Sequence, residues 1–363
     1  MKWPVQKLEE IVSIKTGKLD SNAAVPNGQY PFFTCDPQTL AINTYAYDTE
    51  AVLLAGNNAS GNYTAKYYHG KFNAYQRTYI IESIDKGKLD IHYFLYALNE
   101  QLALLKSISS GSTTKFLTMS MLKPLSVPCP TISVQHRIAS ILSAYDDLIE
   151  NNRRQIKLLE EAAQRLYREW FVELRFPGHE SVKVVDGVPE GWMKVCLKDI
   201  CETKTGKKDA NFGCDDGAYP FFTCAQAPIK APSYSFDCSA VILAGNGDFN
   251  VKLYRGKFEA YQRTYVLSPA NTEYLFLLYN AVSRNMNVLT KGASGSTIKF
   301  LTKGMIDSIE LLIPSSKLLT TYNQNSEALQ KSIEALHRKV ALAVEARDRL
   351  LPRLMNHEME VML

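Results

Sequence analysis

Two long stretches of the chain carry apolar residues at spacings of three and four, or of their sum. The first stretch has Ile138, Leu142, Tyr145, Ile149, Ile156, Leu159, Ala163, Leu166 and Trp170. The second has Tyr322, Leu329, Ile333, Leu336, Val340, Ala343, Leu350 and Leu354. This spacing gathers the apolar side chains on one stripe of a helix, as in the seam of a coiled coil. Because such a helix needs a partner, we expect the two helices to pair with each other, antiparallel.

Polar residues interrupt both stripes. Asn152 occupies a seam position of the first helix, where a buried amide costs stability but fixes the register of the pair. We therefore expect Asn152 to have a specific partner. Arg347 is the charge that enters the second seam.

The ends of the two helices have sequence signals of their own. Ser133 follows a proline and is the expected N-cap of the first helix. The Phe-Pro-Gly sequence of residues 176–178 is expected to stop that helix, and Pro352 to kink or break the second one near its end.

The segments before each helix have shorter patterns. Residues 3–14 indicate a short helix or a helix and strand together. Residues 30–34, 51–55 and 75–81 are rich in β-branched and aromatic residues and are typical of strands, whereas residues 91–106 have helical spacing. Each segment therefore predicts a mixed α/β (α+β) domain.

The chain contains this domain twice. The hexamer Tyr-Pro-Phe-Phe-Thr-Cys at residues 30–35 recurs unchanged at residues 219–224. Other matching segments are 15–18 with 204–207, 51–57 with 240–246, 74–79 with 260–265, and 110–118 with 294–302. A solenoid repeat has only roughly 20 to 50 residues, so the pattern indicates a domain duplication.

The duplication sets the expected domain order. We expect one domain at residues 1–130, the first long helix at 131–178, a linker at 179–190, a second domain at 191–314, and the second helix with the tail at 315–363. A pseudo-twofold arrangement of the copies makes the paired helices antiparallel. The fold class is thus two α/β domains joined by long antiparallel coiled-coil helices.

Length and composition are consistent with this organisation. A chain of 363 residues accommodates two domains of roughly 100 to 150 residues. Its 46% hydrophobic and 21% charged residues are ordinary for a globular protein. No apolar run approaches the roughly 18 residues that span a bilayer, and residues 1–10 do not resemble a signal peptide. We expect a cytoplasmic protein without membrane contact.

Motifs of known catalytic centres are absent from the sequence. It lacks the phosphate-loop, His-Glu-x-x-His, Gly-x-Ser-x-Gly and Asn-Pro-Pro-Tyr motifs. The seven cysteines include no Cys-x-x-Cys pair, whereas zinc sites usually have close ligand pairs. Cys35 and Cys224 occupy equivalent places, which suggests a metal or nucleophile role, but a small buried hydrophobe is the favoured interpretation. We expect no cofactor, no metal and no catalytic residue.

Basic residues recur instead in the duplicated loops, beside glycines and small hydroxyls that could bond phosphate. The net charge of +4 includes no basic arm, so nonspecific phosphate binding should be modest. The candidate DNA contacts of the first copy are Lys15, Thr16, Gly17, Lys18, Asn57, Asn58, Gln76, Arg77, Gly111, Ser112, Thr113 and Lys115. Those of the second copy are Lys204, Thr205, Gly206, Lys207, Asn246, Gln262, Arg263, Gly295, Ser296, Thr297 and Lys299. Recurrence could also record shared folding.

Two of these candidates have a more specific interpretation. Gln76 and Arg77 lie in a predicted strand, and their side chains could form bidentate bonds to base edges or could brace the fold.

The long helices resemble a known family. Residues 134–143 (Val-Gln-His-Arg-Ile-Ala-Ser-Ile-Leu-Ser), 169–172 (Glu-Trp-Phe-Val), 175–178 (Arg-Phe-Pro-Gly) and 347–354 (Arg-Asp-Arg-Leu-Leu-Pro-Arg-Leu) are similar to the conserved helices of the specificity subunit of type I restriction-modification systems. The resemblance spans essentially the whole chain. Residues 131–135 depart from the family's Leu-Ser-Glu-Gln start, and residues 356–358 replace its usual Ser-Gly-Glu.

The resemblance implies a non-catalytic reader of double-stranded DNA. It implies two target recognition domains that bind two half-sites, and partners that comprise two methyltransferase subunits and a restriction and translocase subunit. Two other classes stay open: a nucleic-acid enzyme with its own site through Cys35 and Cys224, and an architectural scaffold without DNA contact.

The two copies diverge most in paired loop segments. These are residues 36–48 against 225–237 and residues 57–69 against 246–255. Because reading different bases requires different side chains on a common frame, the sequence predicts that the base-reading residues lie there.

Overall fold

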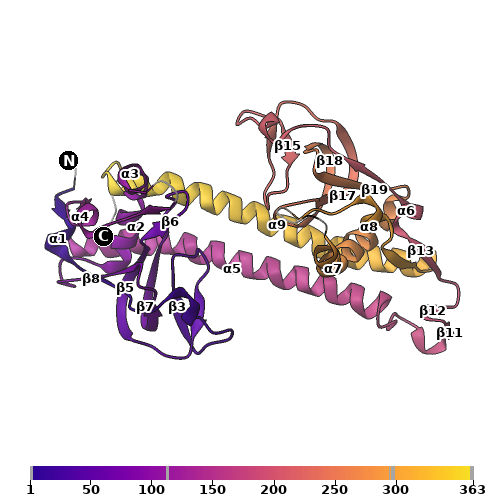
Figure 1. Ribbon diagram of the computed structural model, residues 1–363, viewed down its shortest axis with the longest axis horizontal. Coiled ribbons are helices and arrows are strands. Elements are labelled where there is room, and N and C mark those ends of the chain that lie inside the picture. The colour runs from indigo at the N-terminus through magenta and orange to yellow at the C-terminus, as the bar shows by residue number, and fades with distance from the viewer. Residues whose placement is uncertain (1–2, 112–113, 294, 296–298, 360–363) are drawn as a thin grey trace. The chain divides into compact units, whose positions relative to one another are not determined.

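The structure is a computed structural model that describes residues 3–111, 114–293, 295 and 299–359. The chain forms two compact units (Figure 1). Unit 1 comprises residues 1–152 and 339–363, and unit 2 comprises residues 153–338. The two long helices, α5 (Ile132–Phe171) and α9 (Ser316–Met355), each contribute to both units.

Unit 1 contains a six-stranded mixed sheet in the order β2-β8-β5-β7-β3-β4. Its strands are β2 (Val12–Thr16), β8 (Thr78–Ser83), β5 (Tyr47–Ala55), β7 (Ala65–Ala74), β3 (Tyr30–Phe33) and β4 (Leu40–Ile42). All neighbours pair antiparallel except β3 and β7, which pair parallel. The predicted strands at 30–34 and 51–55 are confirmed, but the third begins only at Thr78.

Unit 2 repeats this sheet in the order β14-β19-β17-β18-β15-β16. The strands are β14 (Cys201–Thr205), β19 (Thr264–Pro269), β17 (Phe236–Ala244), β18 (Val251–Ala260), β15 (Tyr219–Phe222) and β16 (Ile229–Ala231). The register repeats as well, because Tyr47 lies opposite Phe72 in the first copy and Phe236 opposite Phe258 in the second. The duplication and the mixed α/β class are confirmed.

Short elements complete the two units. Unit 1 adds β1 (Val5–Lys7) paired with β10 (Ser126–Pro128), β6 (Asn57–Asn58) paired with β9 (Lys115–Phe116), α1 (Leu8–Ile11), η1 (Ser21–Ala23), α2 (Ile91–Asn99), α3 (Leu102–Ile108) and α4 (Met119–Leu122). Unit 2 adds β11 (Val184–Val185) paired with β12 (Val188–Pro189), β13 (Met193–Cys196) paired with β20 (Glu310–Ile313), η2 (His179–Ser181), α6 (Leu197–Ile200), η3 (Ala210–Phe212), η4 (Thr272–Tyr274), α7 (Leu275–Gly292) and α8 (Lys303–Asp307).

The helix expected over residues 91–106 consists of two helices. A turn at Glu100 and Gln101 separates α2 from α3, and the Gln101 N–H donates to the Leu98 carbonyl at 2.9 Å. The second copy has the single helix α7 at this place.

The start of α5 and the end of α9 share the core of unit 1. Ile138 and Leu142 of α5 and Leu354 and Met355 of α9 are buried in one hydrophobic cluster with α2 and the sheet. Farther along α5, Asp146 accepts a hydrogen bond from Arg347. Residue numbers therefore rise along α5 as they fall along α9, so the two segments run antiparallel in this unit.

The end of α5 meets the start of α9 in unit 2. The rings of Trp170 and Phe171 lie 5.8 Å and 4.8 Å, centroid to centroid, from the ring of Tyr322. All three residues are buried, and Tyr322 is fully covered. The predicted seam residues thus pack within each unit.

Three expectations about the helix ends were wrong. α5 begins at Ile132, so Ser133 lies inside the first turn and is not the N-cap. It ends at Phe171, before residues 176–178, because Leu174 adopts a left-handed conformation (φ 57°) and Arg175 N–H bonds back to the Glu169 carbonyl. Finally, Pro352 does not break α9, because the helix continues through this residue to Met355.

The expected partner of Asn152 is not found. Asn152 is 4% exposed, and its Nδ2 atom has no hydrogen-bond partner among the residues that the structure describes.

The C-terminal tail contacts the first residues of unit 1. Trp3 Nε1 donates to the Leu354 carbonyl at 2.9 Å, and the Trp3 ring stacks on His357 at 3.6 Å between centroids. His357 is one of the residues that depart from the family pattern, and the stack uses its ring directly. Within the described ranges, no helix is long and apolar enough to cross a membrane.

Candidate nucleic-acid interface

Main-chain hydrogen bonds bring the duplicated loops of unit 1 together at one end of the sheet. Gly56 follows β5, and its N–H donates to the Arg77 carbonyl, in the turn before β8, at 2.8 Å. The Gly56 carbonyl in turn accepts from Leu117 N–H at 2.8 Å. Three segments that are distant in sequence therefore form one loop cluster.

The small β6–β9 ladder adds further candidates to this loop cluster. It places Asn57 opposite Phe116 and Asn58 opposite Lys115. The main chain of Ser110 bonds Phe116 in both directions, at 2.8 and 3.3 Å. Gly111 follows with φ at +108°, a conformation that favours glycine. Asn57, Asn58, Gly111 and Lys115 are thus neighbours.

Gln76 and Arg77 form a turn between β7 and β8, so their expected place in a strand was wrong. Both residues are exposed. Gln76 N–H donates to the Leu19 carbonyl at 2.9 Å, which joins this turn to the loop that begins at Lys15. The turn presents two side chains of the kind that can bond base edges.

The Lys-Thr-Gly-Lys loop combines internal and exposed groups. Gly17 is buried, and a Cβ there would lie 2.2 Å from the Ala74 carbonyl oxygen, so the protein's own backbone requires glycine. Lys15 pairs with Glu82 at 2.8 Å, and the Thr16 carbonyl accepts from the Tyr47 hydroxyl at 3.2 Å. Lys18 is exposed.

Unit 2 has the same loop cluster. Gly245 N–H donates to the Arg263 carbonyl at 2.8 Å, the Gly245 carbonyl accepts from Leu301 N–H at 2.8 Å, and Gln262 N–H donates to the Lys208 carbonyl at 2.9 Å. The geometry of both candidate faces is therefore repeated bond for bond.

The other candidates of unit 2 have equivalent surroundings. Asn246 forms a bridge with Phe300, and Gly295 has φ at +106°. Lys204 and Thr205 end β14, and Lys204 pairs with Glu202 at 2.8 Å. A Cβ on Gly206 would lie 1.9 Å from the Ala260 carbonyl oxygen. Lys207, Gln262, Arg263 and Lys299 are exposed. Ser112, Thr113, Ser296 and Thr297 lie outside the described residues.

The equivalent cysteines brace these loop clusters. Cys35 Sγ lies 3.5 Å from the Arg77 carbonyl, and Cys224 Sγ lies 3.7 Å from the Arg263 carbonyl and 2.9 Å from Asn246 Oδ1. Both cysteines are half-buried and have polar contacts, which differs from the favoured interpretation of a small buried hydrophobe. The described residues contain no cluster of three or more His, Cys, Asp or Glu side chains that could hold a metal ion.

Sequence reasoning missed several residues around the loop clusters. Phe116 and Phe300 are each 38% exposed at equivalent positions. The hydroxyls of Tyr79 and Tyr265 donate to the carbonyls of Leu117 and Leu301 at 2.8 and 2.9 Å, and burial raises the pKa of both. Their recurrence in both copies was the available signal.

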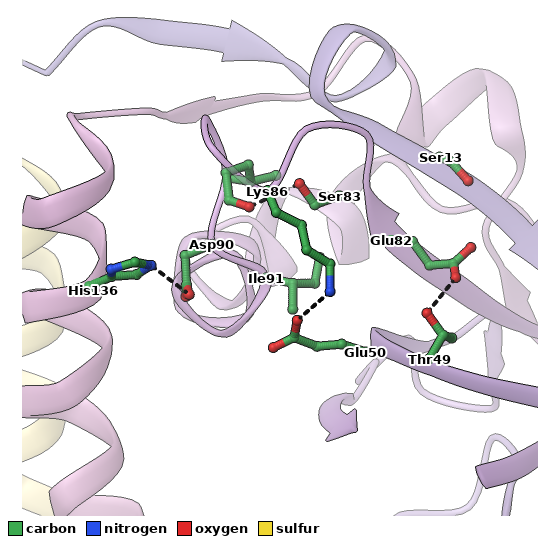
Figure 2. Close-up of a pocket in the computed structure, with 10 residues that line it drawn as sticks. Ser13, Thr49, Glu50, Glu82, Ser83, Lys86, Asp90, Ile91 and His136 are labelled. Atoms are coloured by element: carbon green, nitrogen blue, oxygen red, sulfur yellow. Dashed lines mark hydrogen bonds and ion pairs between the residues drawn. The ribbon is translucent and has the colours of Figure 1, made fainter. Parts of the chain in front are cut away.

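A polar cavity of about 360 Å³ lies at the opposite end of the strands of unit 1 (Figure 2). Within it, Lys86 pairs with Glu50 at 3.2 Å, and His136 Nε2 lies 3.4 Å from an Asp90 carboxylate oxygen. Thr49 donates to Glu82 at 2.8 Å. Although burial acts in the other direction, hydrogen bonds from Lys15 and Thr49 lower the pKa of Glu82.

The fold and the two loop clusters define a tandem α/β protein with two equivalent candidate binding faces. The model of the family described as "Type I restriction modification DNA specificity domain" matches residues 1–161 and 189–345. The chain belongs to this family, which confirms the resemblance carried by the long helices.

Two individual relatives are named as type I restriction enzyme specificity subunits. The chain is 42% identical over 150 residues to the type I restriction enzyme EcoDI specificity subunit of Escherichia coli, a match to 41% of this chain and 33% of that protein. It is 25% identical over 296 residues to the MjaIX specificity subunit of Methanocaldococcus jannaschii, covering 74% of this chain and 68% of the relative. The match thus spans a third of the first relative and about two thirds of the second.

The fold also has a solved counterpart. The crystal structure of a type I restriction-modification system S subunit from M. genitalium aligns with a TM-score of 0.66 at 18% sequence identity. The alignment covers 98% of this chain and 96% of that chain. At this identity the likeness shows a shared fold.

Proposed function

We propose that this chain is the DNA-reading specificity subunit of a type I restriction-modification complex. Each target recognition domain reads one half-site of a bipartite sequence in double-stranded DNA. The chain itself is non-catalytic, and methylation and cleavage belong to partner subunits. Membership of the specificity family supports this proposal.

One observation carries the proposal: both domains build the same loop cluster from the same main-chain bonds, while two other segments of each domain, residues 36–48 against 225–237 and 57–69 against 246–255, differ in side chains. A common frame with variable loops suits a protein that reads two different half-sites, because phosphate contacts set the position and base contacts specify the sequence.

The candidate contacts divide by chemistry. Lys18, Lys115, Lys207 and Lys299 supply ammonium groups for phosphates, and Lys15 and Lys204 would exchange a carboxylate partner for phosphate. Exposed amide and guanidinium groups, which can form bidentate bonds to base edges, belong to Gln76, Arg77, Gln262 and Arg263. Asn57, Asn58 and Asn246 start the divergent loops that we assign to base reading.

The proposed partners are two methyltransferase subunits and a restriction and translocase subunit, in the cytoplasm. The long helices have apolar side chains that could contact them. Leu148 and Leu158 of α5 are 46% and 58% exposed, and Leu342 of α9 is 65% exposed.

A binding assay tests the proposal. Gel shifts of the chain, alone and with its methyltransferase partner, would use a library of mixed duplexes over a series of salt concentrations. We expect enrichment of a two-part sequence and an affinity that falls with salt. Absence of any sequence preference in the complete complex would contradict the proposal.

The same assay separates the two other classes. A scaffold would assemble with the methyltransferase without adding DNA affinity. A nucleic-acid enzyme would modify or cleave DNA in the absence of partners, and a Cys35→Ser, Cys224→Ser double variant would abolish that reaction.

A further inference from the structure

We propose that Lys66 and Lys252 are positioning residues that hold the base-reading loops by their main chain. The loops concerned, called the recognition loops here, are residues 34–39 in the first domain and 223–228 in the second. The inference rests on the proposed function, because it assigns to these lysines the task of keeping sequence preference. Both lysines lie in the divergent segments 57–69 and 246–255, and neither is among the individually named candidate DNA contacts.

The two lysines have the same place in the fold. Each is the second residue of a long strand, Lys66 in β7 and Lys252 in β18. Lys66 lies opposite Leu53 of β5, and Lys252 opposite Ile242 of β17. Both side chains therefore leave the sheet at equivalent points of the two domains.

Each ammonium group bonds the recognition loop of its own domain. Lys66 Nζ donates to the Asp36 carbonyl at 3.2 Å and to Thr39 Oγ1 at 3.1 Å. Lys252 Nζ donates to the Ala225 carbonyl at 2.9 Å. Asp36 and Ala225 follow the repeated hexamer directly, so they are equivalent residues.

In both domains the lysine donates to a main-chain oxygen, which indicates a positioning role for the lysine that does not depend on the side chains of the loop. The side chains at the acceptor position differ, since one is a carboxylate and the other a methyl group, but every residue supplies a carbonyl. A lysine that bonds the carbonyl can hold the loop whatever side chains the loop carries. This is the property needed where the loop sequence must change and its position must not.

A second repeated bond fixes the start of the recognition loop. Asp36 N–H donates to Thr34 Oγ1 at 3.2 Å, and Ala225 N–H donates to Thr223 Oγ1 at 3.3 Å. The repeated threonine therefore accepts from the N–H of residue 36 or 225, and the lysine donates to the carbonyl of that same residue. Both polar groups of this one peptide position are tied to the frame.

The surroundings of the lysines favour an internal role over a phosphate contact. Both side chains are half-buried, and burial lowers the pKa of Lys66 and of Lys252. A lysine that neutralises a phosphate must present its ammonium group to the DNA backbone, whereas these two ammonium groups are already bonded to main-chain carbonyls of the protein.

In the second domain, the same lysine also bonds a second variable loop, residues 246–250. Lys252 Nζ also bonds the Asn250 side chain, whose Nδ2 donates to the Cys224 carbonyl at 3.0 Å. Gln226 Nε2 donates to Asp248 Oδ2 at 2.7 Å. Lys252 thus links the recognition loop to the loop at 246–250, so its loss should disturb more of its half-site than loss of Lys66.

The test uses the full chain with its methyltransferase partner. Lys66→Met and Lys252→Met keep an unbranched four-atom stem and remove the ammonium donor. We expect Lys66→Met to lower the preference for the cognate bases of its half-site by about tenfold, and Lys252→Met to lower it further, because each variant loses the charge-assisted hydrogen bonds to its recognition loop. The other half-site, the affinity for noncognate duplexes and the slope of log affinity against log salt should not change.

Two matched variants and one further measurement exclude a general folding effect. Lys86→Met and Lys194→Met remove exposed, ion-paired lysines elsewhere in the two domains and should leave both half-sites unchanged. Lys66→Arg and Lys252→Arg keep a donor and should restore most of the preference. Hydrogen exchange of the free chain should show faster exchange confined to residues 34–39 in Lys66→Met and to 223–228 and 246–250 in Lys252→Met.

The outcomes separate the inference from the proposed function. A salt slope lower by about one unit with preference intact would make the lysine a phosphate contact and overturn the inference. Unchanged exchange in the recognition loop would overturn it as well, and this measurement needs no DNA. A wild-type complex without sequence preference would contradict the proposed function instead, whatever the exchange data show.

Discussion

Arg347 of α9 donates a hydrogen bond to Asp146 of α5 at 2.6 Å, so the charge that enters the apolar seam is paired across the two helices. Asp146 also accepts from the Tyr96 hydroxyl of α2 at 2.6 Å. One carboxylate therefore ties α5 to the other long helix and to the first recognition domain.

This arrangement makes Asp146 more important for stability than an ordinary surface carboxylate. We expect Asp146→Asn to lower the free energy of unfolding of unit 1 by about 1 to 2 kcal/mol, because the charged acceptor of two hydrogen bonds is lost while both donors stay partly buried. Urea denaturation would measure the change. The control Glu161→Gln removes a carboxylate from an exposed pair with Lys157 and should cost at most about 0.5 kcal/mol. Equal effects of the two variants would contradict the assignment.

Asn152 should be a site where an apolar residue stabilises the protein. Its amide nitrogen is buried without a hydrogen-bond partner among the described residues, and such a group costs about 1 to 3 kcal/mol. We expect Asn152→Leu to raise the thermal midpoint of unfolding, at the expense of the register that a polar seam residue enforces. A lower midpoint would show that the amide has a partner in solution.

Gly17 and Gly206 should tolerate no side chain. An added Cβ would lie 2.2 Å or less from a main-chain oxygen of β7 or β18, and backbone cannot move aside cheaply. We expect Gly17→Ala to destabilise unit 1 and Gly206→Ala to destabilise unit 2. Overpacking typically costs about 1 to 3 kcal/mol, and we expect each of these variants to cost more. Gly304→Ala is the matched control, since nothing lies within 4 Å of its added Cβ. Wild-type stability in either test variant would contradict the geometry.

Lys115 and Lys299 should act as phosphate contacts. Lys115→Ala and Lys299→Ala should each weaken binding about equally for cognate and noncognate duplexes, and should each reduce the slope of log affinity against log salt by about one unit. Fluorescence anisotropy over a salt series would measure both quantities, with Lys86→Ala as the control. A loss confined to one base position would make these lysines base readers.

The divergent loops should carry the specificity of each domain. Replacing residues 36–69 with the equivalent residues 225–255 keeps the frame and exchanges the side chains, so it should change one half-site and leave the other intact. Sequencing of methylated sites in cells that express the chimera reads the result. An unchanged methylation pattern from a folded, active chimera would refute the assignment of base reading to these loops.

The sequence by itself determined the repeated features of this protein. Each depends on local or periodic patterns: the 3–4 spacing that made α5 and α9 amphipathic, the hexamer that revealed the duplication, and the β-branched runs that form the sheet strands. These patterns can be recognised from the sequence because a few neighbouring residues are enough to define an apolar stripe on a helix or an alternation on a strand. The family resemblance followed from the same helices.

Only the tertiary structure decided what the loops do within each domain. Gln76 and Arg77 have strand-like neighbours, but the Gly56 N–H and the Leu19 carbonyl hold them in a turn. The sequence did not distinguish Lys66 from other basic residues, and only the fold places its ammonium group beside the Asp36 carbonyl. The helix end at Phe171 likewise depends on Leu174 adopting a left-handed conformation. The contacts of Gln76, Arg77 and Lys66 join residues far apart in sequence through main-chain atoms, which every residue possesses, so the side-chain pattern carries no record of them.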